Sequence, residues 1–83
     1  MTSWHSMATG YVLVNVEPGM EFSVFENVRG LEKVADATLL FGDYDLIVKV
    51  ISEDMSSIAE FVVEKVRQVE GVLNTKTLAG AEI

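Results

Sequence analysis

The segment Gly42–Asp45 (Gly-Asp-Tyr-Asp) is the one dense group of polar side chains in the sequence that could recognise a ligand. An aspartate in a tight turn often stabilises the turn itself, but a carboxylate can also bind the cationic amine of a ligand. Asp45 favours the second role, because the expected strand pairing places it opposite Leu40 on a partly apolar face. A carboxylate there needs a partner. The sequence therefore offers one candidate recognition loop, with turn formation as the alternative role.

The residues that covalent or metal catalysis would require are not present in a suitable group. There is no cysteine, and the one histidine, His5, stands beside Trp4 in residues 1–9, which we expect to be a leader outside the fold. The glycines all fall at the ends of expected helices and strands, so no phosphate-binding loop is expected. We therefore predict no catalytic residue, no metal site and no cofactor.

Composition and charge limit the possible partners. The chain has 83 residues, of which 13 are acidic and 6 are basic, and its formal net charge is −7. Such a charge disfavours binding to nucleic acid and to anionic lipid. No apolar run approaches the ~20 residues of a membrane span. We expect a single cytoplasmic domain over residues 10–83, with no direct contact to nucleic acid or to a membrane.

Hydrophobic periodicity predicts the order strand, helix, strand, strand, helix, strand. The expected strands cover residues 11–16, 34–41, 44–51 and 72–79, and the expected helices cover residues 20–28 and 54–69. This order is typical of an α+β, ferredoxin-like βαββαβ sandwich, in which an antiparallel four-stranded sheet has two helices on one face.

The two middle strands form a hairpin whose register the sequence specifies. Gly42-Asp43 fits a two-residue type II′ turn, and this turn places the only lysine of the third strand opposite the only acid inside the second, a favourable cross-strand pair. The expected pairs are Phe41–Tyr44, Leu39–Leu46, Ala37–Val48 and Ala35–Val50 on one apolar face, and Leu40–Asp45, Thr38–Ile47 and Asp36–Lys49 on the other.

The sheet face away from the helices is too apolar to be exposed to solvent. A sheet face in contact with water normally carries mostly polar residues, whereas this face has several leucines and isoleucines. We infer that two chains pack sheet against sheet, and we expect Thr75 and Thr77 to lie on this face too. The predicted dimer interface consists of Leu13, Thr38, Leu40, Ile47, Lys49, Ile51 and Leu73.

The stretch Thr38–Val50, TLLFGDYDLIVKV, resembles the hallmark segment of the Lrp/AsnC effector-binding domain, also called the RAM domain. The likeness continues into Val69–Thr77, VEGVLNTKT, and covers Tyr11–Ala79. The resemblance implies a domain that dimerises through its sheets, forms larger homo-oligomers and binds amino acids between dimers, near the hairpin. By position it assigns effector binding to Gly42, Asp43, Tyr44 and Asp45, and to Thr75, Thr77 and Leu78.

Regulators of this family also carry a helix-turn-helix domain, for which the roughly ten residues before the first strand leave no room. The chain is therefore similar to a stand-alone form of the module, and we predict a non-enzymatic amino-acid sensor that also drives oligomerisation. An alternative is an interaction protein that needs no ligand and co-assembles with full-length regulators. A small dimeric ferredoxin-like enzyme ranks last, because the strand positions facing the helices are nearly all aliphatic.

Overall fold

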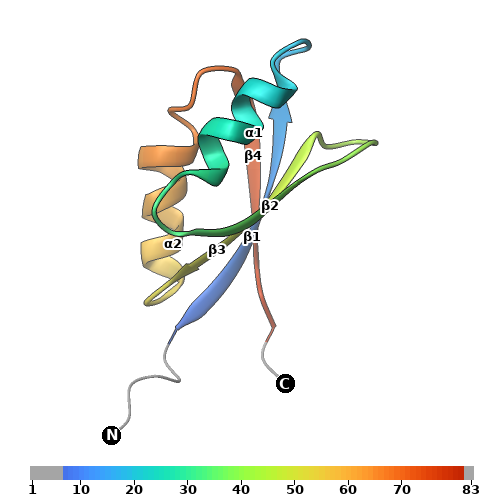
Figure 1. Ribbon diagram of the computed structural model, residues 1–83. Helices are drawn as coiled ribbons and strands as arrows, with labels where there is room; N and C mark the ends of the chain where they lie inside the picture. The colour runs from blue at the N-terminus through green and yellow to red at the C-terminus, as the bar shows by residue number, and fades with distance from the viewer. Residues whose placement is uncertain (1–6, 82–83) are drawn as a thin grey trace, which may run out of the picture.

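The computed structural model describes residues 7–81 and has the predicted architecture, a four-stranded antiparallel sheet with both helices on one face (Figure 1). The sheet order β2-β3-β1-β4 confirms the ferredoxin-like fold. The elements are β1 (Ala8–Val16), α1 (Glu21–Arg29), β2 (Val34–Leu39), β3 (Leu46–Ser52), α2 (Met55–Phe61), η2 (Val62–Val66) and β4 (Val72–Ala79).

β1 begins earlier than the sequence predicted. Ala8 and Thr9 pair with Ser52 and Ile51 of β3, so the last two residues of the expected leader belong to the sheet. The predictions made for Trp4 and His5 lie outside the described residues.

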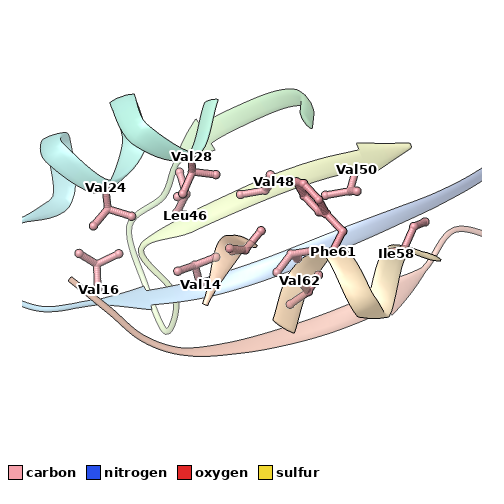
Figure 2. Packing of buried hydrophobic residues seen from close by; sticks show 12 residues of the cluster. Val14, Val16, Val24, Val28, Leu46, Val48, Val50, Ile58, Phe61 and Val62 are labelled. Atoms are coloured by element: carbon pink, nitrogen blue, oxygen red, sulfur yellow. The ribbon is translucent and has the colours of Figure 1, made fainter. Parts of the chain in front are cut away.

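The core fills the space between the helices and one face of the sheet (Figure 2). Alternate residues of β1 and β3 are buried, as expected for strands with one covered face. Phe61 of the second helix is buried as well. The buried hydrophobic residues are Val12, Val14, Val16, Val24, Val28, Leu46, Val48, Val50, Ile58, Phe61, Val62 and Val66.

The second helix starts where the sequence predicted, and it changes from an α-helix to a π-helix before it ends. The backbone N–H of Ser57 donates to the Asp54 carboxylate over 2.8 Å, which is a standard N-cap contact. The last turn is the π-helix η2, in which the Arg67 N–H donates to the Val62 carbonyl five residues back. Val62 and Val66 remain buried through this turn.

The hairpin register is confirmed in the middle of the strands and differs at both ends. The pairs Asp36–Lys49, Ala37–Val48, Thr38–Ile47 and Leu39–Leu46 are those predicted. Towards the start of β2, an irregularity at Ala35 makes Val34 the partner of Val50 and leaves Ala35 exposed. At the tip, the strands stop at Leu39 and Leu46, so residues 40–45 form a wider loop than a two-residue turn. Phe41 is fully exposed there and is not paired with Tyr44.

The prediction that Thr75 and Thr77 of β4 lie on the open face of the sheet is wrong. Thr75 pairs with Val14 and Thr77 pairs with Val12, and direct cross-strand partners share a face, so both threonines lie on the helix side of the sheet. The cause is a register shift, in which Val16 pairs with Val72 and Asn15 with Asn74. Leu73 is skipped by the pairing and is exposed. An extra residue of this kind reverses which face of the sheet each following side chain lies on.

The turn before β4 depends on a glycine. Gly71 has φ +101°, and a Cβ at this position would lie 2.8 Å from a methyl carbon of Val24. Its carbonyl accepts the Glu17 N–H over 2.8 Å, which joins the end of β1 to the start of β4. The backbone conformation and the contact with α1 therefore both require glycine.

We expect Gly71→Ala to lower the free energy of unfolding by roughly 2–4 kcal/mol, since it combines a left-handed alanine with overpacking against Val24. Gly19→Ala is the matched control, because Gly19 has φ +93° but no atom within 4 Å of the added Cβ. Gly19→Ala should lower the free energy of unfolding only by the cost of a left-handed alanine backbone, roughly 1–2 kcal/mol. Urea unfolding at equal protein concentration measures both. Equal losses in the two variants would contradict the packing argument.

Candidate functional site

The tip of the β2–β3 hairpin presents the four residues of the predicted recognition loop. It extends beyond the helices at one end of the molecule (Figure 1). Gly42 has φ +132°, a backbone conformation that side chains disfavour. Phe41 and Asp43 are exposed, and Tyr44 and Asp45 are half-buried. In one chain the loop is therefore an open surface.

Asp45 attaches this loop to the central strand. Its Oδ2 accepts the backbone N–H of Val16 over 2.8 Å, and its own N–H donates to the Val14 carbonyl over 3.0 Å. Leu40 closes the loop by donating its N–H to the Asp45 carbonyl over 2.9 Å. The partner predicted for this carboxylate is therefore the backbone N–H of Val16. Within residues 7–81, Oδ1 has no hydrogen-bond donor and remains available to a ligand.

The predicted residues of β4 are only partly brought to the loop. Thr75 pairs with Val14, the residue whose carbonyl receives the Asp45 N–H, so Thr75 and Asp45 flank β1 from opposite sides. Two strand spacings, about 10 Å, separate them. Thr77 and Leu78 lie farther along β4, towards the other end of the sheet. A single chain therefore does not gather all seven predicted effector residues around one point.

The open face of the sheet, opposite the helices, carries five of the seven predicted interface residues in regular positions. Leu13, Ile47 and Thr38 are cross-strand neighbours on β1, β3 and β2, and Lys49 and Ile51 follow along β3. All but Thr38 are half-buried in the single chain. The other two predicted residues, Leu40 and Leu73, lie outside the regular ladder, at the hairpin tip and at the β4 irregularity.

A hollow of about 630 Å³ lies at the other end of the sheet from the hairpin tip. Sequence reasoning did not predict it, because its lining comes from both ends of the chain and from the start of α2. The one feature of the sequence that could have indicated this hollow is Lys49, a lysine within an otherwise largely apolar strand. We call this hollow the end groove; it is lined by Met7, Ala8, Thr9, Tyr11, Lys49, Glu53, Asp54, Met55, Gly80 and Ala81.

Asp54 is the titratable group in the end groove whose pKa is shifted. Hydrogen bonds from the Ser57 backbone N–H and then from the Ser57 side chain hold the pKa of Asp54 below its ordinary value, and Lys33 adds a smaller effect in the same direction. The Asp54 carboxylate is therefore ionised at neutral pH and already serves as the cap of α2.

Two smaller hollows lie on the helix side. One, of about 330 Å³, separates the α1–β2 connection from α2 and is lined by Leu31, Lys33, Glu60, Phe61 and other residues. The second, of about 320 Å³, lies between α1 and β2. Within residues 7–81, no three His, Cys, Asp or Glu side chains are grouped to hold a metal ion. No helix in this part of the chain is long and apolar enough to cross a membrane.

A family model described as the Lrp/AsnC ligand binding domain matches residues 9–79, and the chain therefore belongs to this family. The predicted resemblance is confirmed. The domain is an effector-binding module of a family of transcription regulators.

Individual relatives agree with this assignment. An uncharacterised helix-turn-helix-type transcriptional regulator of Pyrococcus horikoshii is 27% identical over 73 residues, which are 84% of this chain and 49% of the relative. The chain thus spans about half the length of the curated relatives it matches. The crystal structure of FFRP-DM1 is similar with a TM-score of 0.82 and 30% identity, covering 89% of this chain and 99% of that one.

A transcriptional regulator from Neisseria meningitidis, solved as a complex with L-Met, has the same fold. Its TM-score is 0.79 at 18% identity, and the match covers 90% of this chain and 50% of that one.

We expect Asp45→Ala to lower the free energy of unfolding by about 1–3 kcal/mol, because the partly buried Val16 N–H loses its acceptor. Asp45→Asn keeps an acceptor oxygen and should cost about 1 kcal/mol or less. Asp43→Ala, at an exposed position in the same loop, should stay within about 0.5 kcal/mol. Urea unfolding ranks the three variants. Equal stability of the two alanine variants would show that Asp45 does not attach the loop.

Proposed function

We propose that this domain is a non-enzymatic, cytoplasmic amino-acid sensor, and that it binds its effector at the hairpin tip. The observation that carries the proposal is the arrangement of Asp45. One carboxylate oxygen is fixed by the Val16 N–H, and the other is left at the base of the exposed Gly-Asp-Tyr loop. A fixed, half-buried carboxylate suits the ammonium group of an amino acid. The neisserial relative solved with L-Met supports this class of ligand.

The remaining groups of the loop suit the carboxylate and the side chain of an amino acid. Gly42 has no side chain, so its backbone can approach a carboxylate closely, and exposed loop N–H groups are good donors to an anion. Tyr44 is half-buried beside Asp45 and offers a ring to an apolar side chain. Thr77 and Leu78 are remote from the loop in one chain, so in our proposal they reach the effector from a neighbouring copy.

Assembly is the second part of the proposal. The open face has an apolar centre at Leu13 and Ile47, with Ile51 beyond it, and no element of the described chain covers it. A patch of this kind marks an association surface. We propose that a second copy packs on it, and that dimers associate further into a larger homo-oligomer.

A second candidate function is co-assembly with full-length regulators without any ligand. The observation that favours it is the length of the relatives: the chain matches about half of a helix-turn-helix regulator, so such a regulator contains a domain of the same fold. That domain could pair through the same open face.

The amino-acid hypothesis predicts that isothermal titration of the protein with the common amino acids detects binding of at least one. Asp45→Asn should then weaken the affinity at least about tenfold, because the ammonium loses its ionised partner while the loop keeps its attachment. Asp36→Asn, an exposed acid on β2, is the matched control and should leave the affinity unchanged. Absence of binding by every amino acid would refute the sensor and favour ligand-free co-assembly.

The assembly hypothesis predicts that the protein has at least the mass of a dimer in light scattering. Leu13→Asp should shift the mass towards a monomer, because it places a charge at the centre of the open face. Val63→Asp introduces the same charge at an exposed valine of η2 and should leave the mass unchanged. A monomeric wild type, or equal behaviour of the two variants, would contradict an interface on the open face.

A further inference from the structure

We propose that the outer edge of β2 is a second self-association surface, on which β2 of another copy adds as an antiparallel strand about a two-fold axis. The proposal rests on the proposed function only for the expectation that the chain self-associates. It uses a different surface, the edge of the sheet instead of its open face. The two four-stranded sheets would join at this edge into one continuous sheet.

The backbone of β2 has hydrogen-bonding groups that face away from the rest of the sheet. β2 is an outer strand, and within residues 7–81 no other strand lies on its free side. Leu40 donates its N–H across the hairpin to the Asp45 carbonyl, so its backbone faces β3. Successive strand residues face opposite edges, so the backbone of Thr38 also faces β3, while the N–H and C=O groups of Ala37 and Leu39 face outward.

The sequence of β2 favours one symmetrical register. With Thr38 opposite Thr38 of the second copy, Ala37 and Leu39 become direct partners twice, and each such pair exchanges two backbone hydrogen bonds. An axis at Asp36 would place two carboxylates opposite each other, which is unfavourable. An axis at Ala37 would require pairing at Ala35, where the strand is irregular. The register centred on Thr38 avoids both.

The side chains beside this edge suit the same arrangement. Leu39 is 42% exposed on the helix side of the sheet, and the register places it against the small side chain of Ala37. Phe25 of α1 lines the hollow between α1 and β2 together with Ala37. Its ring centroid lies 6.2 Å from that of Phe22, which is 67% exposed. Apolar surface therefore extends from α1 to an unpaired strand edge, and such a surface favours association.

The other outer strand, β4, is less suited to pairing with a second copy. It carries a lysine, Lys76, and its register is interrupted at Leu73. Charged lysines and extra residues are the features that normally prevent edge-to-edge pairing. The regular part of β2 matches itself about a two-fold axis, as the contact between two identical chains requires. This match identifies a second copy of the chain as the partner.

The first test is disulfide cross-linking, for which the chain is well suited because it contains no cysteine. Thr38→Cys should form a covalent dimer on mild oxidation, since partners of this kind have Cα atoms about 4.5 Å apart, within the range for a disulfide. Val63→Cys, at an exposed valine of η2, is the matched control. We expect at least about tenfold less covalent dimer from this control.

A mixing experiment tests the register. Ala37→Cys and Leu39→Cys should cross-link when the two proteins are mixed, and each should cross-link far less alone, because diagonal neighbours lie about 7–8 Å apart. Both side chains lie on the helix side of the sheet. Packing of two copies across the open face would leave these residues on the outer sides of the two sheets. This cross-link therefore reports the edge contact and not the open face.

A proline variant separates the two surfaces. Ala37→Pro removes an outward N–H and leaves the β2–β3 hydrogen bonds in place, so it should abolish the Thr38→Cys cross-link and lower the mass in light scattering about twofold. Leu13→Asp, on the open face, should leave that cross-link intact. Urea unfolding measures the stability of Ala37→Pro, and the mixing experiment decides the outcome if this variant does not fold.

Three results would overturn the proposal. The first is equal cross-linking of Thr38→Cys and Val63→Cys. The second is cross-linking of Ala37→Cys alone to the same extent as in the mixture with Leu39→Cys. The third is loss of the Thr38→Cys cross-link in the Leu13→Asp background, which would assign the contact to the open face. A cross-link that persists in that background supports the β2 edge even if packing across the open face fails.

Discussion

The pairing of β1 with a strand on each side is the constraint on which the rest of this domain depends. β1 is bonded to β3 along one edge and to β4 along the other, and its alternate valines form the centre of the core. At its end, the Val16 N–H is bonded to the Asp45 carboxylate and the Glu17 N–H to the Gly71 carbonyl. The backbone of β1 and of Glu17 therefore holds the hairpin tip and the start of β4 by hydrogen bonds, and the buried valines of β1 pack in the centre of the core.

This arrangement gives the molecule one closed face and one open face. The helices bury short β-branched side chains on one side of the sheet, while Leu13 and Ile47 stay half-exposed on the other. A domain of this size buries only roughly 60–65% of its unfolded surface, so a partner on the open face would add substantially to its core. The hairpin tip and the end groove lie at opposite ends of the same central strands.

Most of the fold was predictable, because hydrophobic periodicity and turn residues mark each element. The Asp36–Lys49 pair was enough to set the hairpin register over the middle of both strands. Two of the errors fall where one extra residue interrupts a strand, at Ala35 and at Leu73. Nothing in the local sequence marks these positions, since a bulge is chosen by how the strand must twist to pack on its neighbours. The shift at Leu73 placed Thr75 and Thr77 on the opposite face from the one predicted.

The sequence by itself determined the family, the order of elements and the loop Gly42–Asp45, because these are carried by residue type and spacing within short segments. Only the tertiary structure decided how Asp45 is used, since its partner, the Val16 N–H, is 29 residues away. The same holds for the end groove, where Thr9, Lys49 and Gly80 come from three different strands or their ends. Contacts between distant segments follow from how the helices and sheet pack together, and a single sequence records the residues but not that packing.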